Sequence, residues 1–389
     1  MATTQYDIST YLEEAKSLAQ KVAKVSDKID HDRQIPTDLA DEMADKGFFR
    51  LLLPESLGGA ELKHPDFLQI LEIFANVDGS TAWCVNQNNV FSTNSLRMPE
   101  DIAKEIWGDQ RAVVTNGPPT SLSQAIPVDG GYKLSGRWHF SSGMDHATWI
   151  AAMAPISDGT GSKDASRDRT GARIMLLPKN QVKFLDLWQV NGLRGTASFS
   201  YEIEDLFVPM DHTYDPTWTP RNVTGVYAIP TTLLFATGFS TVALGVARSS
   251  LDSAISIAGE KVPGRSSSLL QSQPSTHRVI GEAEAMWKAS KAFLGQSASA
   301  VWESAYKKQS LTTEERINLR LATTHGIRMA AQIVDMTYNL CGTDAIFERN
   351  PIQRKFQDVH VMTQHTQGRF SNYETAGQFF LGLEPSGNF

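Results

Sequence analysis

Residues 130–149 read GGYKLSGRWHFSSGMDHATW, and the pattern of the sequence changes at this stretch. Two glycines open a run in which apolar and polar residues alternate, which is typical of a strand that follows a tight turn. Upstream the apolar spacing is helical, since Leu18, Val22, Val25 and Ile29 fall on one helix face. The stretch therefore predicts that a β region follows a helical region.

More short apolar or alternating runs, bounded by turn residues, follow as far as residue 209. A polar, glycine-rich segment at residues 157–171 predicts a surface loop between two of them. The helical pattern then returns, and we expect long helices at residues 227–258, 276–306, 313–340 and 350–383. This order predicts an α+β fold. We expect an N-terminal helical domain (1–118), a central β-barrel or small sheet domain (119–212) and a C-terminal four-helix bundle (213–389).

Composition narrows the class of protein. The chain has 389 residues and a net charge of −7, and its Lys and Arg residues are not clustered, which argues against a nucleic acid partner. The two cysteines, Cys84 and Cys341, lie far apart in sequence, as in proteins of a reducing compartment. The first residues lack the basic and apolar regions of a signal peptide. We expect a soluble, cytoplasmic protein.

One segment could suggest a membrane protein. No charged residue lies between Arg221 and Arg248, a length sufficient to span a bilayer. Pro230, Gly238 and Gly245 interrupt this segment together with several hydroxyl residues, and nothing else in the chain has membrane character. A helix that is apolar on all sides is also what a large soluble core requires, so we predict a buried central helix and no membrane partner.

Four motifs together resemble a known family. They are VDGSTAW (77–83), the stretch 130–149, GLRGTASFSYEIEDLFVP (192–209) and FQDVHVMTQHTQGRF (356–370). Over the whole chain these motifs resemble the acyl-CoA dehydrogenase fold. Within that fold the chain looks most like the two-component flavin-dependent monooxygenases, which include hydroxyphenylacetate and secosteroid hydroxylases, indole oxygenases and a dibenzothiophene oxygenase.

The resemblance implies a function. Such an enzyme takes reduced flavin, FAD or FMN, from a separate NAD(P)H:flavin reductase. With dioxygen it inserts one oxygen atom into a small aromatic or heteroaromatic substrate. The resemblance also implies a homotetramer. The chain has no G-x-G-x-x-G nicotinamide fingerprint after a strand, which agrees with reduction of the flavin by another protein.

The resemblance also assigns flavin contacts. A flat, amphipathic ring needs an apolar surface and a few placed polar groups. For the ring we predict contacts from Asn116, Trp138, Phe140, Ser141, Ser142, Gly143 and Ser198. For the phosphate and the distal part of the cofactor we predict Arg265, Ser267 and Gly342. The alternative interpretation is that Trp138 and Phe140 belong to the sheet core, that the serines are turn residues and that residues 261–268 form an ordinary loop.

A dehydrogenase would need a carboxylate base. The usual glutamate of that family lies eight residues after an aspartate that corresponds to Asp358, and Thr366 occupies this position. Residues 221–247, where some members carry the base, contain no acid. His365 stands close by, and the resemblance implies that it keeps the distal oxygen of a flavin C4a-hydroperoxide protonated. We predict His365, Ser142 and Asn88 as catalytic residues.

The sequence indicates the identity of the substrate less directly than that of the cofactor. Phenol hydroxylases of the family carry a second histidine after the VDGSTAW motif, whereas this chain has WCVNQNNVFSTN at residues 83–94. Amides there suit indole or a similar ring better than a phenol, or they cap a helix end. With Asn89, we expect Tyr227, Phe235 and Phe239 to line a dry substrate pocket. The alternatives are an acyl-CoA dehydrogenase or oxidase, a phenol hydroxylase, an N- or S-oxygenase on the same scaffold, and a flavin carrier without catalysis.

Overall fold

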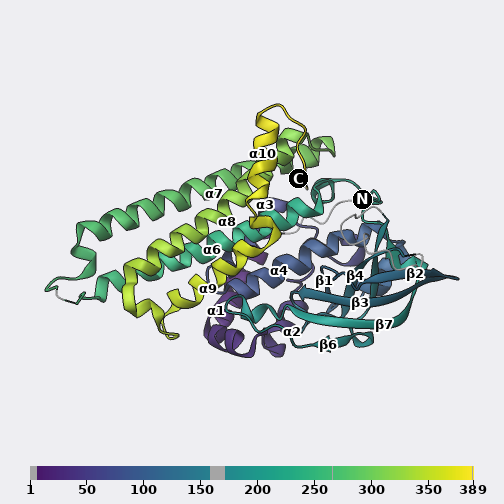
Figure 1. Ribbon diagram of the computed structural model, residues 1–389, viewed down its shortest axis with the longest axis horizontal. Coiled ribbons are helices and arrows are strands. Elements are labelled where there is room, and N and C mark those ends of the chain that lie inside the picture. Colours follow the sequence, from purple (N-terminus) through teal and green to yellow (C-terminus); the bar gives the residue numbers. More distant parts are fainter. Residues whose placement is uncertain (1–6, 158–170, 265, 388) are drawn as a thin grey trace.

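The computed structural model describes residues 7–157, 171–264, 266–387 and 389. Helices come first, two small sheets follow, and a bundle of long helices completes the chain (Figure 1). This order confirms the predicted α+β fold. Most of the loop predicted at 157–171 lies outside the described residues.

The N-terminal part is helical. Its helices are α1 (Ile8–Asp32), α2 (Thr37–Asp45), α3 (His64–Ala75), α4 (Gly79–Ser92) and α5 (Glu100–Trp107). Helix α4 is buried along its whole length, although half of its last eight residues carry side-chain amides. It contacts α6 of the bundle on one side and β1 on the other, between the helical and the sheet parts of the molecule (Figure 1).

The described strands form two four-stranded sheets. One has the order β1 (Val114–Gly117), β4 (Trp149–Pro155), β5 (Ala172–Pro178) and β8 (Thr213–Tyr214), and only its β1–β4 pair is parallel. The other is antiparallel, with the order β2 (Gln124–Val128), β3 (Gly131–Ser141), β7 (Phe199–Pro209) and β6 (Lys183–Leu185). Alternation along β3 and β7 places Trp138 and Tyr201 in the core between the sheets.

The C-terminal part is a bundle in which α6 (Thr231–Glu260) packs against α7 (Pro274–Lys308), α8 (Thr313–Cys341) and α9 (Pro351–Gln364). Helix α6 alone among the described helices is long and apolar enough to cross a membrane, but 78% of its most apolar window is buried inside the protein. It is the predicted central helix. Its apolar residues and those of the N-terminal helices form one continuous core.

The helix predicted at 350–383 is broken, contrary to expectation. Helix α9 ends at Gln364, His365 adopts extended backbone angles, and α10 (Ser371–Phe380) follows a short 3-10 turn. Two interactions stabilise the break. The guanidinium of Arg328 donates to the carbonyls of Thr363 and Gly368, and Nδ1 of His365 accepts from the backbone N–H of Gln367. These contacts satisfy backbone groups that the helix end would leave unpaired.

Asn89 holds the segment at residues 48–52 rather than a substrate. Its Oδ1 accepts from the N–H groups of Leu51 and Leu52, and its Nδ2 donates to the carbonyls of Phe48 and Val85. The prediction that Asn89 binds substrate is wrong, because its side chain is fully buried and its amide is saturated. Tyr227 is buried in the helical core, and its hydroxyl donates to the Leu52 carbonyl. Tyr227 therefore supports the same segment.

We predict that Asn89→Ala destabilises the protein by about 2–4 kcal/mol, because two buried N–H groups and two carbonyls lose this side-chain partner. Urea unfolding followed by circular dichroism measures the loss. The exposed Asn180 provides a matched control, and Asn180→Ala should leave the midpoint unchanged. Equal midpoints for the two variants would contradict a structural role for Asn89.

Candidate active site

A backbone irregularity in β3 presents the first part of the site. The pairing of β3 with β7 shifts between Trp138 and Ser141, and Phe140 in between adopts a left-handed conformation with φ of 58°. A non-glycine residue pays roughly 1–2 kcal/mol for this conformation. The bulge turns the Phe140 ring outward, where it is 60% exposed and lies edge-on to Trp188. Strand β3 thus ends in an exposed aromatic face.

Trp138 does not belong to this surface, and its predicted contact with the flavin ring is wrong. Its ring is fully buried and stacks on Tyr201 at 5.2 Å, and its N–H donates to the Met153 carbonyl. In a regular strand, side chains two positions apart point to the same face, so Trp138 would share the exposed face of Phe140. The bulge between them turns the two side chains to different faces. Trp138 is a sheet-core residue.

A chain of hydroxyl groups runs beneath the bulge. The indole N–H of Trp83 donates to Ser142 Oγ at 3.1 Å, Ser142 Oγ lies 2.7 Å from Ser198 Oγ, and Ser198 Oγ lies 2.6 Å from Thr196 Oγ1. Thr196 donates to the Leu193 carbonyl at 2.8 Å. We call Ser142, Ser198 and Thr196 the hydroxyl chain. It joins α4 to the loop that precedes β7.

The two ends of the hydroxyl chain orient its protons. An indole nitrogen only donates and a carbonyl only accepts, so each hydroxyl accepts from the residue before it and donates to the next one. The proton of Ser142 is therefore directed to Ser198. Because its proton is already used, Ser142 Oγ can only accept a further hydrogen bond. It therefore suits an N–H donor on a ligand. This refines the predicted role of Ser142 and places Ser198 beside it.

Aromatic rings gather on the other side of Trp83. Phe239 stacks on Trp83 at 3.8 Å, Phe235 stacks on Phe239 at 5.8 Å, and His365 meets both Trp83 and Phe239 edge-on, at 5.3 and 4.8 Å. We call Trp83, Phe235, Phe239 and His365 the aromatic cluster. Phe235 and His365 are partly exposed, whereas Phe239 is buried. Phe235 and His365 can thus face a ligand directly, and Phe239 packs behind them.

His365 is a neutral hydrogen-bond donor. Although His365 is partly exposed, the packing of Trp83 and Phe239 against its ring desolvates it, and this, with smaller contributions from the positive charges of Arg369 and Arg320, lowers its pKa to about 4. Because Nδ1 accepts from Gln367 N–H at 3.4 Å, the proton of the neutral ring is on Nε2. Within the described residues Nε2 has no hydrogen-bond partner. The unfolded chain binds this proton more readily, so stability from this group is present above about pH 6.5 and is lost as the pH falls toward 4.

Asn88 supports the site from behind rather than acting on a substrate. It is buried, its Nδ2 donates to the Val114 carbonyl, and its Oδ1 accepts from Nε2 of His146 at 3.1 Å. A Cβ at Gly143 would come within 2.8 Å of Asn88 Oδ1 and 2.9 Å of His146 Nε2. The predicted catalytic role of Asn88 is therefore wrong. Asn88 and His146 pack directly against Gly143, which adopts a left-handed φ of 77° in the turn after β3.

Asn116 and Ser141, which were also predicted to contact the flavin ring, lie near this turn. The Nε2 of Gln87 donates to Oδ1 of Asn116, which is partly exposed in β1. Ser141 is buried, and its Oγ has no partner among the described residues. A flat ring with an apolar face and polar edges fits this arrangement, because Phe140 offers the face while Asn116 and Ser142 offer polar atoms, whereas the Ser141 hydroxyl is enclosed against Gly117.

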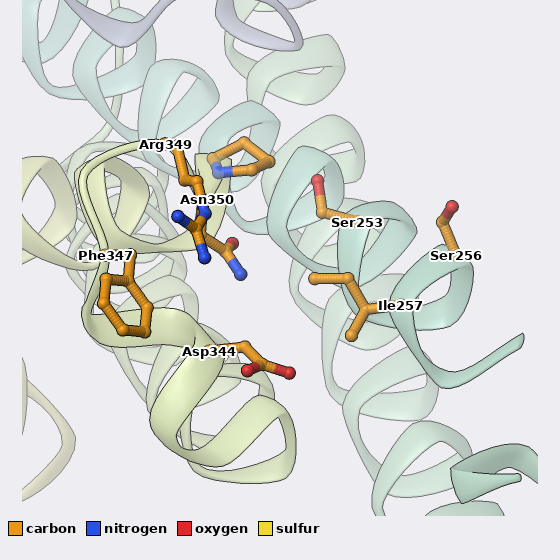
Figure 2. A pocket seen from close by; sticks show the side chains of 8 residues that line it. Ser253, Ser256, Ile257, Asp344, Phe347, Arg349 and Asn350 are labelled. Carbon is orange, nitrogen blue, oxygen red and sulfur yellow. The ribbon is translucent and has the colours of Figure 1, made fainter. Parts of the chain in front are cut away.

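Gly342 and Ser267 lie elsewhere in the chain. Gly342 follows α8, where Lys261 donates to the Cys341 carbonyl and pairs with Asp344 at 2.9 Å. Beside it is a pocket of about 420 Å³, in which Asp344 and Phe347 face Ser253 and Ile257 of α6 (Figure 2). The pocket lies at the start of α9 and His365 at its end, about 20 Å away along a helix of 14 residues. Ser267 is exposed in the neighbouring loop, and Arg265 lies outside the described residues.

The sequence interpretation missed three side chains at the site. Trp83 connects His365 with Ser142, Thr196 directs the hydroxyl chain, and Arg320 lies buried near His365. The clue to Trp83 was its place at the end of VDGSTAW, in the first half of an unusually polar helix and three residues before its run of amides. Arg320 sits in an amphipathic helical pattern, so no local signal distinguishes it from surface arginines.

Comparisons with known proteins show what the chain is similar to in sequence and fold. Models of the acyl-CoA dehydrogenase N-terminal and C-terminal domains match residues 9–107 and 237–370. The chain is 29% identical over 360 residues to an indole-3-acetate monooxygenase of Pseudomonas putida, covering 92% of this chain and 90% of that protein. It is 27% identical to the oxygenase subunit HsaA, a flavin-dependent monooxygenase of Rhodococcus jostii, over 86% of this chain and 88% of that one. The structure of XiaF from a Streptomyces species in complex with FADH2 superposes with a TM-score of 0.87 at 21% identity, covering 98% of each chain.

We predict that His365 stays neutral, with its proton on Nε2, at pH 5.5. An ordinary histidine with a pKa near 6.5 is about nine-tenths protonated at that pH. Nitrogen NMR of histidine-labelled protein, with His365→Asn to assign the signal, reports the protonation of both ring nitrogens. An imidazolium signal from His365 at pH 5.5 would show that its surroundings do not depress its pKa.

Proposed function

Since this chain belongs to the two-component flavin-dependent monooxygenases of the acyl-CoA dehydrogenase fold, we propose that it oxygenates a small aromatic compound with a ring of the indole type. It uses reduced flavin and dioxygen, and a separate reductase supplies the reduced flavin. The name of the Pseudomonas putida relative supports an indole ring, as does the apolar and aromatic lining at Phe235 and Phe239.

One observation carries this proposal. The indole of Trp83 touches His365 with its ring and donates its N–H to Ser142, so the predicted proton donor and the predicted flavin contact meet on one side chain. These residues come from α4, the end of β3 and the end of α9. A ring bound against Phe140 and Ser142 and a substrate bound against Phe235 and His365 would then be neighbours.

In this proposal, Phe140 and Ser142 bind the flavin ring, and His365 controls a proton beside the substrate. When bound, the reduced flavin supplies the electrons that activate dioxygen. Phe140 would cover the apolar face of the ring, and the acceptor at Ser142 would receive an N–H of the reduced flavin. His365 would donate a hydrogen bond from Nε2 to an oxygen atom beside the substrate and hold a proton there. Trp83 and Phe239 exclude water from this point, which favours transfer of the oxygen over release of hydrogen peroxide.

The alternative dehydrogenase reaction has no support at this site. It needs a carboxylate close to the substrate. Among the described residues, no Asp or Glu forms a hydrogen bond or an ion pair with the aromatic cluster. Asp358 is the nearest acid along α9, but it is buried and accepts from the Leu193 N–H. Its role is to hold the loop that carries the hydroxyl chain.

Assembly and location are part of the proposal. We propose a homotetramer in the cytoplasm, in which the loop with Ser267 and the turn at Gly342 reach the flavin of a neighbouring subunit. Within one chain the pocket beside Gly342 is separated from His365 by the length of α9, about 20 Å, which favours contact of this region with the flavin of another copy. Exposed apolar residues at α10, including Phe380, Leu381 and Leu383, offer surface for such an assembly.

We predict that His365→Asn uncouples the reaction. An asparagine keeps the acceptor for the Gln367 N–H but lacks a donor at the Nε2 position, so the turn stays intact while proton control is lost. With indole as substrate, product formed per reduced flavin oxidised should fall about tenfold or more. Hydrogen peroxide should rise to match, and reduced flavin should bind within about twofold of wild type.

Two further variants sharpen the test. His365→Gln places an amide donor near the Nε2 position and should retain more product than the asparagine variant. His277→Ala changes an exposed histidine of α7 and should leave coupling unchanged. Wild-type coupling in His365→Asn would remove His365 from the mechanism. Absence of any oxygenated product from the wild-type protein with both indole and indole-3-acetate would contradict the proposed substrate ring.

A further inference from the structure

Arg320 is a buried cation that the mechanism above does not use. It lies on α8 and is only 2% exposed. Its Nη1 donates to Oε1 of Gln367, its Nη2 donates to Oγ1 of Thr232 at 3.0 Å, and its Nε has no partner among the described residues. A guanidinium has five N–H groups, so most of its hydrogen-bonding capacity is unused.

No negative charge compensates Arg320. Within the described residues it forms no ion pair with any Asp or Glu, and both of its hydrogen-bond partners are neutral. Burial lowers its pKa to about 10, so the side chain is still a cation at neutral pH. Burying an unpaired charge is costly, and proteins usually keep one only where a counter-ion binds.

The same helix contains an arginine with a purely structural role, and it looks different. Arg328, two turns further along α8, donates to the carbonyls of Gly368 and Thr363 and lies over the ring of Phe370 at 3.9 Å. Its charge stabilises the end of α9, where helix carbonyls concentrate negative potential. Arg320 has no such carbonyl partner, and thus stabilisation of a helix end does not account for it.

A second positive feature lies at the same place. Thr232, which accepts from Arg320, is in the first turn of the 30-residue helix α6. The N-cap, Pro230, makes no side-chain cap, the first turn has no acidic residue, and the N–H groups of Thr231 and Thr232 have no backbone partner in the described chain. Unpaired N–H groups at a helix start attract anions. The helix start and the guanidinium therefore favour negative charge at one point.

This point adjoins the aromatic cluster. Thr232, Phe235 and Phe239 follow one another at spacings of three and four residues, which places them on one face of α6. Gln367, the other partner of Arg320, is two residues from His365. Thr232 lies about 4.5 Å from Phe235 along the helix axis, a spacing that matches one or two methylene groups between a ring and an acid.

We propose that Arg320 and the start of α6 bind an anionic group of the substrate, so that the substrate is an aromatic acid with a short carboxylate side chain. This inference rests on the proposed function, because it assumes that the ring lies against Phe235 and His365. The carboxylate would take the free N–H groups of Arg320, and this contact would orient the ring toward His365.

Binding and turnover of matched probes test the proposal. Indole-3-acetate and phenylacetate are each compared with their neutral amides, first by calorimetry on the protein and then by product analysis with reduced flavin and dioxygen. We expect each acid to bind at least tenfold tighter than its amide. In Arg320→Gln this preference should disappear through weaker binding of the acids, with binding of the amides within about twofold of wild type.

Two variants complete the design. Arg278→Gln removes an exposed arginine of α7 and the same formal charge, and it should keep the preference for the acid. Arg320→Lys keeps the charge and serves if the glutamine variant does not fold, and its preference should be intermediate. Equal binding of acid and amide to the wild-type protein, no binding of the acids, or a preference that survives in both Arg320 variants would overturn the anion site. The proposed function fails separately, if neither acids nor amides yield an oxygenated product.

Discussion

Helix α4 imposes the constraint on which the rest of the site depends. It is buried over its full length yet carries four consecutive amide side chains, and a buried amide has to find partners inside the protein. Together they reach three parts of the chain, namely α6, β1 and the segment at residues 48–52. Asn86 donates to the Phe235 carbonyl of α6, Gln87 to Asn116 of β1, Asn88 to the Val114 carbonyl, and Asn89 holds residues 48–52. These amides point in different directions around the axis of α4, so the helix fixes the position of β1 relative to α6 and residues 48–52.

The same helix positions the chemistry. Trp83 sits one turn before these amides, and its indole joins the hydroxyl chain to the aromatic cluster. The loop that carries the hydroxyl chain is held from the opposite side, since Asp358 of α9 accepts from the Leu193 N–H at 2.6 Å. Burial raises the pKa of Asp358 to about 7. Three left-handed residues, Phe140, Leu193 and Ala197, lie on the strand end and loop that these contacts hold, and backbone strain of this kind persists only in well-braced surroundings.

The electrostatics of the site are unusual for a place where proton transfer is expected. His365 is kept neutral, Arg320 is kept charged, and no acid is paired with either among the described residues. A neutral imidazole beside a cation is a better hydrogen-bond donor than a base, since protonating it would add a second charge to the same apolar region. The environment thus favours stabilising negative charge on a bound molecule over removing a proton from carbon, which is the reverse of what a dehydrogenase requires.

Local sequence patterns were sufficient for the order of elements, the α+β class and the central buried helix, because periodicity and turn residues act over short distances. The motifs also pointed to His365, Ser142 and Ser198 as candidates, and these residues lie at backbone turns and breaks that leave a local signature, while their roles stay predictions. Contacts between distant segments were beyond reach of such patterns. Only the folded chain shows that Trp138 faces the sheet core, that Asn89 and Tyr227 serve the 48–52 segment, and that Arg320 lies beside His365 without a counter-charge. Burial and hydrogen-bond partners are properties of the packed structure, and the same residue types in the same local pattern can face a core, a solvent or a substrate.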